Sequence, residues 1–201
     1  FEHLVFLPDY QLCFDVKSKG RKGGVLNIRK SLGCITEAGL FSANAKGLEL
    51  LRRKEGVPFK YQEVDIIAID GNGDEINALT YLVPQDKTED FVAPHPEYLK
   101  VCEDGYKQRG ICSSDLHLAA KNQKIEPWPG IFTYGTLMRK ESRYPIIGQL
   151  GVGCSLMAQC FGTLTTNGNY PALNLNGNGF SWGDLIFSDD ILLIAKLRGL
   201  S

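Results

Sequence analysis

The stretch Phe132-Thr133-Tyr134-Gly135-Thr136-Leu137-Met138 decides the fold of this chain of 201 residues, through its content and through its late position. The apolar run before Gly135 predicts a short strand that ends at a glycine beside a small hydroxyl residue. Glycine adopts backbone angles that other residues avoid, so the N–H groups after Gly135 can converge on a ligand oxygen. A Tyr-Gly-Thr-Leu sequence alone is more often a strand that ends in an ordinary turn. The neighbouring segments therefore decide between the two interpretations.

Two segments that follow this stretch favour a ligand loop: Met138-Arg139-Lys140-Glu141-Ser142-Arg143 and Gly168-Asn169-Tyr170-Pro171-Ala172-Leu173. Together the three resemble the opening of a γ-glutamylcyclotransferase domain, the fold shared with AIG2-like proteins. In that family the Tyr-Gly-[Ser/Thr] loop cradles the γ-glutamyl group. The resemblance therefore implies that substrate is bound by Tyr134, Gly135, Thr136 and Leu137. Leu137 replaces the asparagine of the Tyr-Gly-Ser-Asn form, which points toward the AIG2-like branch.

The part of the chain before this loop resembles the remainder of the same kind of domain. The matching segments occur in the family's order and are Leu7–Asp15, Gly23–Ile28, Leu51–Val57, Ala78–Leu82 and Pro94–Tyr98. Residues 1–127 thus resemble one domain without its first strand and loop, and residues 131–201 resemble the front half of a second. A weak internal repeat agrees with this, since Gly39–Ser42 before one helical pattern resembles Asp184–Phe187 before another at Ile194–Ser201.

Local patterns predict a mixed α/β fold. Apolar spacing predicts helices over about Ala45–Lys54 and Pro96–Arg109. The Gly/Asn/Asp cluster Asp70–Asp74 lies between two β-rich runs and predicts a hairpin. Residues 125–130 contain two prolines and a glycine and predict a linker. The resemblance adds a curled, barrel-like sheet in each part, with helices outside it.

Two further expectations concern the backbone. Gly23-Gly24 predicts a tight bend, because glycine in a strand-rich region usually marks a bulge or a close backbone approach. The segment Ile131–Leu137 has two possible partners. It can fill the place of the missing first strand in residues 1–127, which would bring the Tyr-Gly-Thr loop to Glu55. Alternatively it can stay with its own part of the chain and pair with Gln159–Leu164, which has the lower closure cost.

Glu55 is the candidate catalytic base. A cyclotransferase of this family turns a γ-glutamyl compound into 5-oxoproline and a free amine, so a carboxylate must take a proton from the substrate's ammonium group. By pattern alone, Glu55 is one more charge at a solvated helix end. The resemblance favours catalysis, because Glu55-Gly56-Val57 matches the segment that carries the family's catalytic glutamate. Arg52 stands where the family often has aspartate, and it would lower the pKa of Glu55 if it faced the site.

Tyrosines supply the remaining candidate contacts. Tyr98 matches a substrate-binding tyrosine of the family, and helix packing is the alternative role for it. Tyr81 lies in a strand at a position that lines the family's pocket, and a core position is equally consistent with the pattern. Tyr61 is a weaker candidate of the same kind. The resemblance implies no cofactor and no metal, and a small γ-glutamyl molecule as the partner.

Composition limits the other classes of function. The chain has 22 Lys and Arg against 23 Asp and Glu, a net charge of −1 that gives no argument for nucleic acid. No apolar run approaches the roughly 20 residues of a membrane helix, and no signal peptide is recognisable at Phe1. Six cysteines without a Cys-x-x-Cys pair, together with three histidines, favour reduced thiols in a cytoplasmic protein over a zinc site.

Two alternative functions stay open. The first is an inactive γ-glutamyl-binding or regulatory module, because Ser201 falls where the second part should carry its carboxylate. The second is a cysteine-dependent amidohydrolase, which ranks last because no cysteine and histidine form a recognisable pair.

Overall fold

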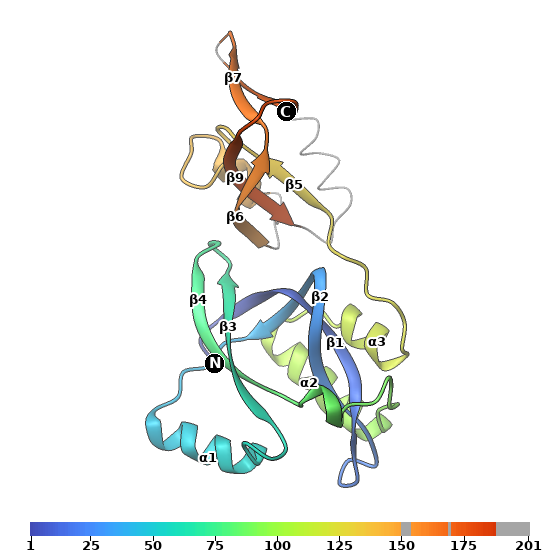
Figure 1. The fold of residues 1–201 in the computed structure, drawn as a ribbon. Helices are drawn as coiled ribbons and strands as arrows, with labels where there is room; N and C mark the ends of the chain where they lie inside the picture. The colour runs from blue at the N-terminus through green and yellow to red at the C-terminus, as the bar shows by residue number, and fades with distance from the viewer. Residues whose placement is uncertain (150–153, 169, 188–201) are drawn as a thin grey trace. The chain divides into compact units, whose positions relative to one another are not determined.

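The computed structural model describes residues 1–149, 154–168 and 170–187, and the chain divides into two compact units (Figure 1). The first unit contains Phe1–Asp70 and Glu75–Pro127. The second contains Gly71–Asp74 and the chain from Trp128 onward. The division after Pro127 lies in the proline-rich segment 125–130, where fixed φ angles and missing N–H groups end regular structure. Among the described residues, no helix is long and apolar enough to cross a membrane.

The first unit is built on an antiparallel sheet of four strands in the order β2-β1-β3-β4. A long hairpin joins β1 (Leu4–Ser18) to β2 (Gly23–Gly39), and a second joins β3 (Gln62–Asp70) to β4 (Glu75–Leu82). The hairpin predicted around the Gly/Asn/Asp cluster is therefore confirmed. β1 and β3 pair only through Val5 and Phe6, opposite Asp70 and Ile69.

Two irregularities in the pairing of β1 with β2 curl the hairpin. The register shifts between Pro8 and Tyr10, and again between Phe14 and Val16. At the first shift Asp9 has φ 60°, and its carboxylate accepts a hydrogen bond of 2.8 Å from the N–H of Gly33. Bulges of this kind increase the local twist and change the direction in which side chains point. The second shift leaves Asp15 without a cross-strand partner.

Three helices flank this sheet: α1 (Ala45–Glu55), α2 (Pro96–Arg109) and α3 (Ser114–Ala120), with a 3-10 turn η1 at Gln85–Lys87. The two helices predicted from apolar spacing are confirmed. In Figure 1, α2 and α3 lie beside β1. Their apolar sides close a core over the hairpin, whose buried members are Leu12, Phe14, Cys34, Leu116, Ala119 and Ile125.

Gly23 and Gly24 start β2 and do not form the bend that the sequence predicts, which lies just before them in residues 19–22. The other part of that expectation is correct, because the chain passes very close to these glycines. A Cβ on Gly24 would lie 1.9 Å from the carbonyl oxygen of Val92, and the N–H of Gly24 donates to Ala93 at 2.9 Å. Only glycine fits at this crossing.

The second unit contains a sheet in the order β5-β9-β6 and a separate β7-β8 hairpin. Its strands are β5 (Gly130–Thr133), β6 (Cys154–Phe161), β7 (Thr163–Asn167), β8 (Tyr170–Asn174) and β9 (Phe180–Phe187), with helix α4 at Tyr144–Gln149. A small core holds α4 against the sheet. Its buried members are Ile147 and Ile186, with Ile131, Leu137 and Tyr144 packed around them. The segment Ile194–Ser201, including Ser201, lies outside the described residues.

The pairing of β5 contradicts the first alternative for Ile131–Leu137. It confirms that the segment stays with its own part of the chain, but with a different partner strand from the predicted one. β5 pairs with β9 through four residue pairs, from Gly130 opposite Phe187 to Thr133 opposite Asp184. It is not a strand of the first unit's sheet, so it does not fill the place of a missing strand there. It also does not pair with residues 159–164, because β9 pairs with β6 along the full strand and occupies the position between β6 and β5.

Candidate active site

Glu55 is the last residue of α1, and local capping fixes where this helix begins and ends. The Asn44 side chain accepts from the N–H of Gly47 at 2.8 Å, which satisfies one of the free donors of the first turn. Gly56 follows Glu55 with φ 69°, a left-handed conformation that glycine adopts without steric cost. The chain therefore turns immediately after Glu55, and the Glu55 side chain is partly buried at this corner.

A cavity of about 310 Å³ lies in the first unit between the β1–β2 hairpin, β4 and α2. The end of β2 contributes Thr36, Glu37, Ala38 and Gly39 to its wall. Three tyrosines also line it: Tyr61 just before β3, Tyr81 on β4 and Tyr106 on α2. Polar side chains (Asn27, Thr36, Glu37 and Thr80) and apolar ones complete the wall, so the cavity offers both kinds of contact to a small molecule.

The charge of Glu55 acts on two of these tyrosines. Burial is the main reason that the pKa of Tyr61 is raised, and the negative charge of Glu55 raises it further. The pKa of Tyr81 is also raised, by burial first, then by Glu63, with a smaller contribution from Glu55. A carboxylate acts on a phenol in this way only from nearby. Glu55 therefore lies near Tyr61 and Tyr81, although it is not itself one of the residues that line the cavity.

Arg52 does not face Glu55 as a free cation. Its guanidinium group donates two hydrogen bonds of 2.6 Å to the carboxylate of Glu63 on β3. This fork geometry satisfies both partners and lowers the pKa of Glu63. Tyr81 donates to the same carboxylate at 3.3 Å. The Arg52 cation, which would otherwise lower the pKa of Glu55, is thus paired with Glu63.

Tyr98 lies in a different position from the other tyrosines. It is on α2, and its hydroxyl oxygen accepts from the N–H of Leu26 at 3.2 Å. The Arg21 guanidinium group lies 5.1 Å from the centre of the Tyr98 ring. Burial raises the pKa of Tyr98 to about 12. Tyr98 does not line the cavity of Tyr61 and Tyr81, although its partner Leu26 does.

In the second unit, the predicted loop Tyr134–Leu137 follows β5 and makes a compact turn. The N–H of Met138 donates to the carbonyl of Gly135 at 2.9 Å, and the N–H of Arg143 donates to Thr136 at 2.9 Å. Gly135 is not among the left-handed glycines, so the predicted reason for a glycine here is wrong. The structural reason is space, because a Cβ on Gly135 would lie 3.1 Å from the Pro171 ring.

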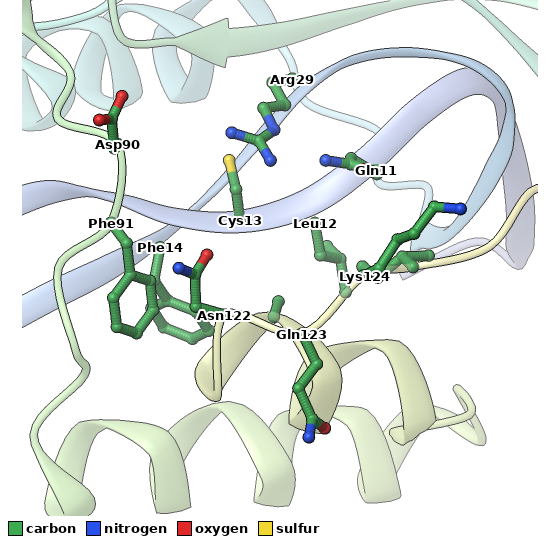
Figure 2. A pocket seen from close by; sticks show the side chains of 12 residues that line it. Gln11, Leu12, Cys13, Phe14, Arg29, Asp90, Phe91, Asn122, Gln123 and Lys124 are labelled. Carbon is green, nitrogen blue, oxygen red and sulfur yellow. The ribbon is translucent and has the colours of Figure 1, made fainter.

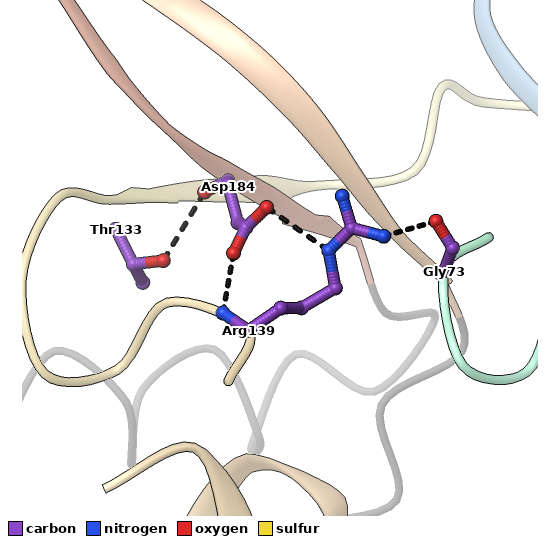
Figure 3. A network of polar contacts seen from close by, with 4 residues as sticks. All are labelled: Gly73, Thr133, Arg139 and Asp184. Carbon is purple, nitrogen blue, oxygen red and sulfur yellow. Dashed lines mark hydrogen bonds and ion pairs between the residues drawn. The ribbon is translucent and has the colours of Figure 1, made fainter. Parts of the chain in front are cut away.

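A buried ion pair holds the end of this loop against β9 (Figure 3). Asp184 is 3 % exposed and accepts from the backbone N–H of Arg139 at 2.5 Å and from its Nε at 3.1 Å. The Arg139 guanidinium group also donates to the carbonyl of Gly73. Thr133 donates its hydroxyl hydrogen to the Asp184 carbonyl at 3.2 Å. The residues on both sides of the loop, Thr133 and Arg139, are thus hydrogen-bonded to the same residue of β9, Asp184.

Three polar residues of these sites are not among the candidates predicted from the sequence: Glu37, Arg139 and Asp184. Asp184 is the only charge in the otherwise apolar or uncharged run Phe180–Phe187, a pattern typical of a buried and paired carboxylate. Glu37 lines the cavity and accepts from the N–H of Cys112 at 2.8 Å. Its alternating strand position gives no such signal.

Comparison with known proteins gives structural matches only. No family model matches the chain, and no curated protein matches it. A solved structure described as a gamma-glutamyl cyclotransferase covers 74 % of this chain and 85 % of its own, at 26 % identity and a TM-score of 0.52. An uncharacterised protein from Homo sapiens covers 63 % of this chain and 75 % of its own, at 27 % identity and a TM-score of 0.52.

A third similar structure, YkqA from Bacillus subtilis, covers 62 % of this chain and 45 % of its own, at 23 % identity and a TM-score of 0.51. Its likeness concerns the fold alone. The curled antiparallel sheets with few helices match the γ-glutamylcyclotransferase-like fold, so the fold class predicted from the sequence is confirmed.

Proposed function

We propose that this chain is a γ-glutamylcyclotransferase-like enzyme that converts γ-glutamyl amino acids or amines into 5-oxoproline and a free amine, with Glu55 as the general acid and base. The observation that carries the proposal is the position of Glu55. It ends α1, and its charge acts on Tyr61 and Tyr81. These two tyrosines line a cavity of about 310 Å³, in a fold similar to that of a gamma-glutamyl cyclotransferase.

In the proposed reaction Glu55 passes two protons in turn from the substrate's α-nitrogen to the leaving amine. The carboxylate takes a proton from the substrate's α-ammonium group, and the free amine attacks the γ-carbonyl carbon to form the ring C–N bond. The tetrahedral intermediate then collapses and the bond to the leaving amine breaks. That amine takes the first proton from Glu55. The ring nitrogen then loses its second proton to the same carboxylate, which passes it to the released amine to give an ammonium group, so the enzyme is regenerated and no cofactor is needed.

Tyr61 and Tyr81 are proposed to hold the substrate curled for this attack. Both hydroxyl groups are protonated at neutral pH, because their pKa values are raised. Tyr61 can therefore donate a hydrogen bond to a substrate carboxylate or to the developing oxyanion. Tyr81 can do so by turning its hydroxyl hydrogen away from the Glu63 carboxylate. Positioning of this kind and donors aimed at the developing charge supply large parts of a catalytic rate.

The two units together support the proposed division of the chain into one domain without its first strand and the front half of another. In the second unit β5 pairs with β9 at Asp184, on the side away from β6. By the internal repeat, Asp184 corresponds to Gly39 at the end of β2. In the first unit β2 is the edge strand, and Gly39 pairs with Leu4 of β1 on one side. A strand equivalent to β5 would therefore pair along the other side of β2, next to the cavity.

The second candidate function is a binding or regulatory module without catalysis, and one observation favours it for the second unit. Asp184 is the buried carboxylate beside the Tyr-Gly-Thr loop, and Arg139 already engages it through two hydrogen bonds. Both carboxylate oxygens of Asp184 therefore already accept hydrogen bonds and are not free to take a proton from a substrate. The loop of the second unit is therefore proposed to bind γ-glutamyl groups without converting them.

Release of 5-oxoproline by the full chain tests the proposed function. The purified protein is incubated with γ-glutamyl-L-alanine, and 5-oxoproline and alanine are quantified. We expect equal amounts of both products from the wild type and almost none from Glu55→Gln. Glu49→Gln is the matched control, because Glu49 lies on the same helix and only forms an exposed ion pair with Arg53. Substrate binding without any product would support the binding module instead.

A further inference from the structure

A second cavity of the first unit lies outside the proposed active site. It has a volume of about 550 Å³, within the roughly 300–1,000 Å³ of small-molecule sites. Its lining comes from the polar side of the β1–β2 hairpin and from the segment between β4 and α2. The charged residues of this lining are Asp15, Arg29, Lys30, Glu89 and Asp90. It shares Asn27 and Ile28 of β2 with the cavity of Tyr61 and Tyr81, but neither tyrosine lines it.

Asp15 is the unusual member of this lining. It is only 4 % exposed, and it is the extra residue at the second bulge of β1. Its two carboxylate oxygens accept from neutral groups, the Asn27 amide at 2.9 Å and the Cys13 thiol at 3.2 Å. Among the described residues, it forms no ion pair. A buried carboxylate is normally paired with a cation, because desolvation of an isolated charge is costly.

Two cations, Arg29 and Lys30, line the same cavity, but neither is paired with Asp15. In the amide orientation that satisfies both groups, the Gln11 oxygen accepts from Arg29 Nε at 2.7 Å. Figure 2 shows the Gln11 amide and the Cys13 thiol pointing toward the Arg29 guanidinium group. This view is of a neighbouring cavity of about 290 Å³, which shares Arg29 and Asp90 with the larger one. Within the described part of the chain, neither Arg29 nor Lys30 has a carboxylate partner.

We infer that this cavity binds a small zwitterion of the α-amino-acid type, with its ammonium group at Asp15 and its carboxylate at Arg29 and Lys30. An ammonium group would supply the cation that Asp15 lacks. Each Asp15 carboxylate oxygen has two lone pairs, and the hydrogen bonds from Asn27 and Cys13 occupy only one on each, so an ammonium group can donate to the others. Glu89 and Asp90 make the lining more acidic than basic, which disfavours a simple anion. A metal ion is disfavoured, since no group of three or more His, Cys, Asp or Glu side chains in the described ranges is placed to hold one.

Binding of three probes to the full chain tests this inference by calorimetry without any turnover. L-Alanine carries both charges, ethylamine only the ammonium group, and propionate only the carboxylate. We expect saturable binding of L-alanine that is at least tenfold tighter than that of either other probe. Asp15→Asn keeps the shape and removes the charge, and it should weaken L-alanine on the order of tenfold or more. Asp65→Asn, an exposed residue of β3, is the matched control and should bind normally.

Arg29→Gln is the second variant, because Arg29 is exposed and its replacement does not disturb the core. It should weaken L-alanine and leave ethylamine unchanged. The inference is overturned if L-alanine gives no saturable binding, if Asp15→Asn and Arg29→Gln both bind it like the wild type, or if ethylamine binds as tightly as L-alanine. Loss of L-alanine binding in Glu55→Gln alone would also overturn it, since the amino acid would then occupy the proposed active site.

Discussion

Tyr98 illustrates how the role of one side chain depends on contacts that the sequence does not show. Its position in Pro94–Tyr98 matches a substrate-binding segment of the resembled family, yet its hydroxyl oxygen accepts from the β2 backbone at Leu26. That bond ties α2 to β2 across 72 positions of sequence. We therefore expect Tyr98 to contribute to stability at neutral pH and this contribution to be lost in alkali.

Tyr98→Phe should reduce the loss of stability in alkali. The pKa of Tyr98 is raised from 10.0 to about 12 in the folded protein, so the unfolded chain loses this proton first. Stability therefore falls as the pH rises from about 10 to about 12, by up to about 1.4 kcal/mol per pH unit for one group. Urea unfolding at pH 8, 10 and 11 measures the slope. Equal slopes in the wild type and Tyr98→Phe would contradict this assignment.

At the level of residues, the sequence supports Glu55 as a candidate but not its surroundings. A glycine such as Gly56 is typical of a helix C-terminus, so the position of Glu55 at the end of a helix is predictable from the local sequence. The Arg52–Glu63 pair spans 11 positions and forms only because α1 returns next to β3. The Arg139–Asp184 pair spans 45 positions in the same way. Such pairs depend on tertiary packing, which local patterns do not encode.

At the level of elements, the loop after β5 depends on Asp184. Asp184→Asn leaves the Arg139 guanidinium group without its charge partner in a largely buried place, where the two side chains are 19 % and 4 % exposed. Removing one member of a buried pair costs about 3–5 kcal/mol. We expect faster hydrogen exchange at the Arg139 amide and lower stability of the second unit. Glu141→Gln, in the exposed part of the same loop, is the control, and unchanged exchange in Asp184→Asn would refute the role of the pair.

Gly24 is the corresponding test for the first unit, where the chain near Val92 crosses β2. Gly24→Ala places a methyl group 1.9 Å from a backbone carbonyl, which cannot rotate away. Overpacking of this kind costs roughly 1–3 kcal/mol, occasionally more. Gly71→Ala is the control, because a Cβ there meets nothing within 4 Å. Equal urea midpoints for both variants would show that the crossing tolerates a side chain.

The individual elements were more predictable than their pairing. Apolar spacing located α1 and α2, and the Gly/Asn/Asp cluster located the β3–β4 hairpin, because these signals are local. The position of β5 next to β9 was not predictable, since many antiparallel arrangements satisfy the same alternation of side chains. The bulges at Asp9 and Asp15 were missed for the same reason, because a bulge exists only relative to a partner strand.

At the level of the whole molecule, the fold class followed from an ordered series of resembling segments, and the similar solved structures agree with it. Composition alone gave only a globular chain with nearly balanced charge. The assignment of residues 1–127 and 131–201 to parts of two domains stays a proposal. The internal repeat supports it, and so does the outer edge of β2, which corresponds to the side of β9 that pairs with β5.

The central claim is that Glu55 transfers the proton in a cyclisation of γ-glutamyl compounds. The most direct test separates binding from turnover in Glu55→Gln. The dissociation constant for γ-glutamyl-L-alanine is measured by calorimetry, and kcat is measured from 5-oxoproline formed at saturating substrate.

We expect Glu55→Gln to bind the substrate as the wild type does, because glutamine has nearly the same shape, and to lose about 10²–10⁴ in kcat, the usual contribution of a general acid and base. A kcat in Glu55→Gln equal to that of a fully active wild type would contradict the assignment of Glu55. A wild type that binds the substrate and forms no 5-oxoproline would contradict the enzymatic account itself.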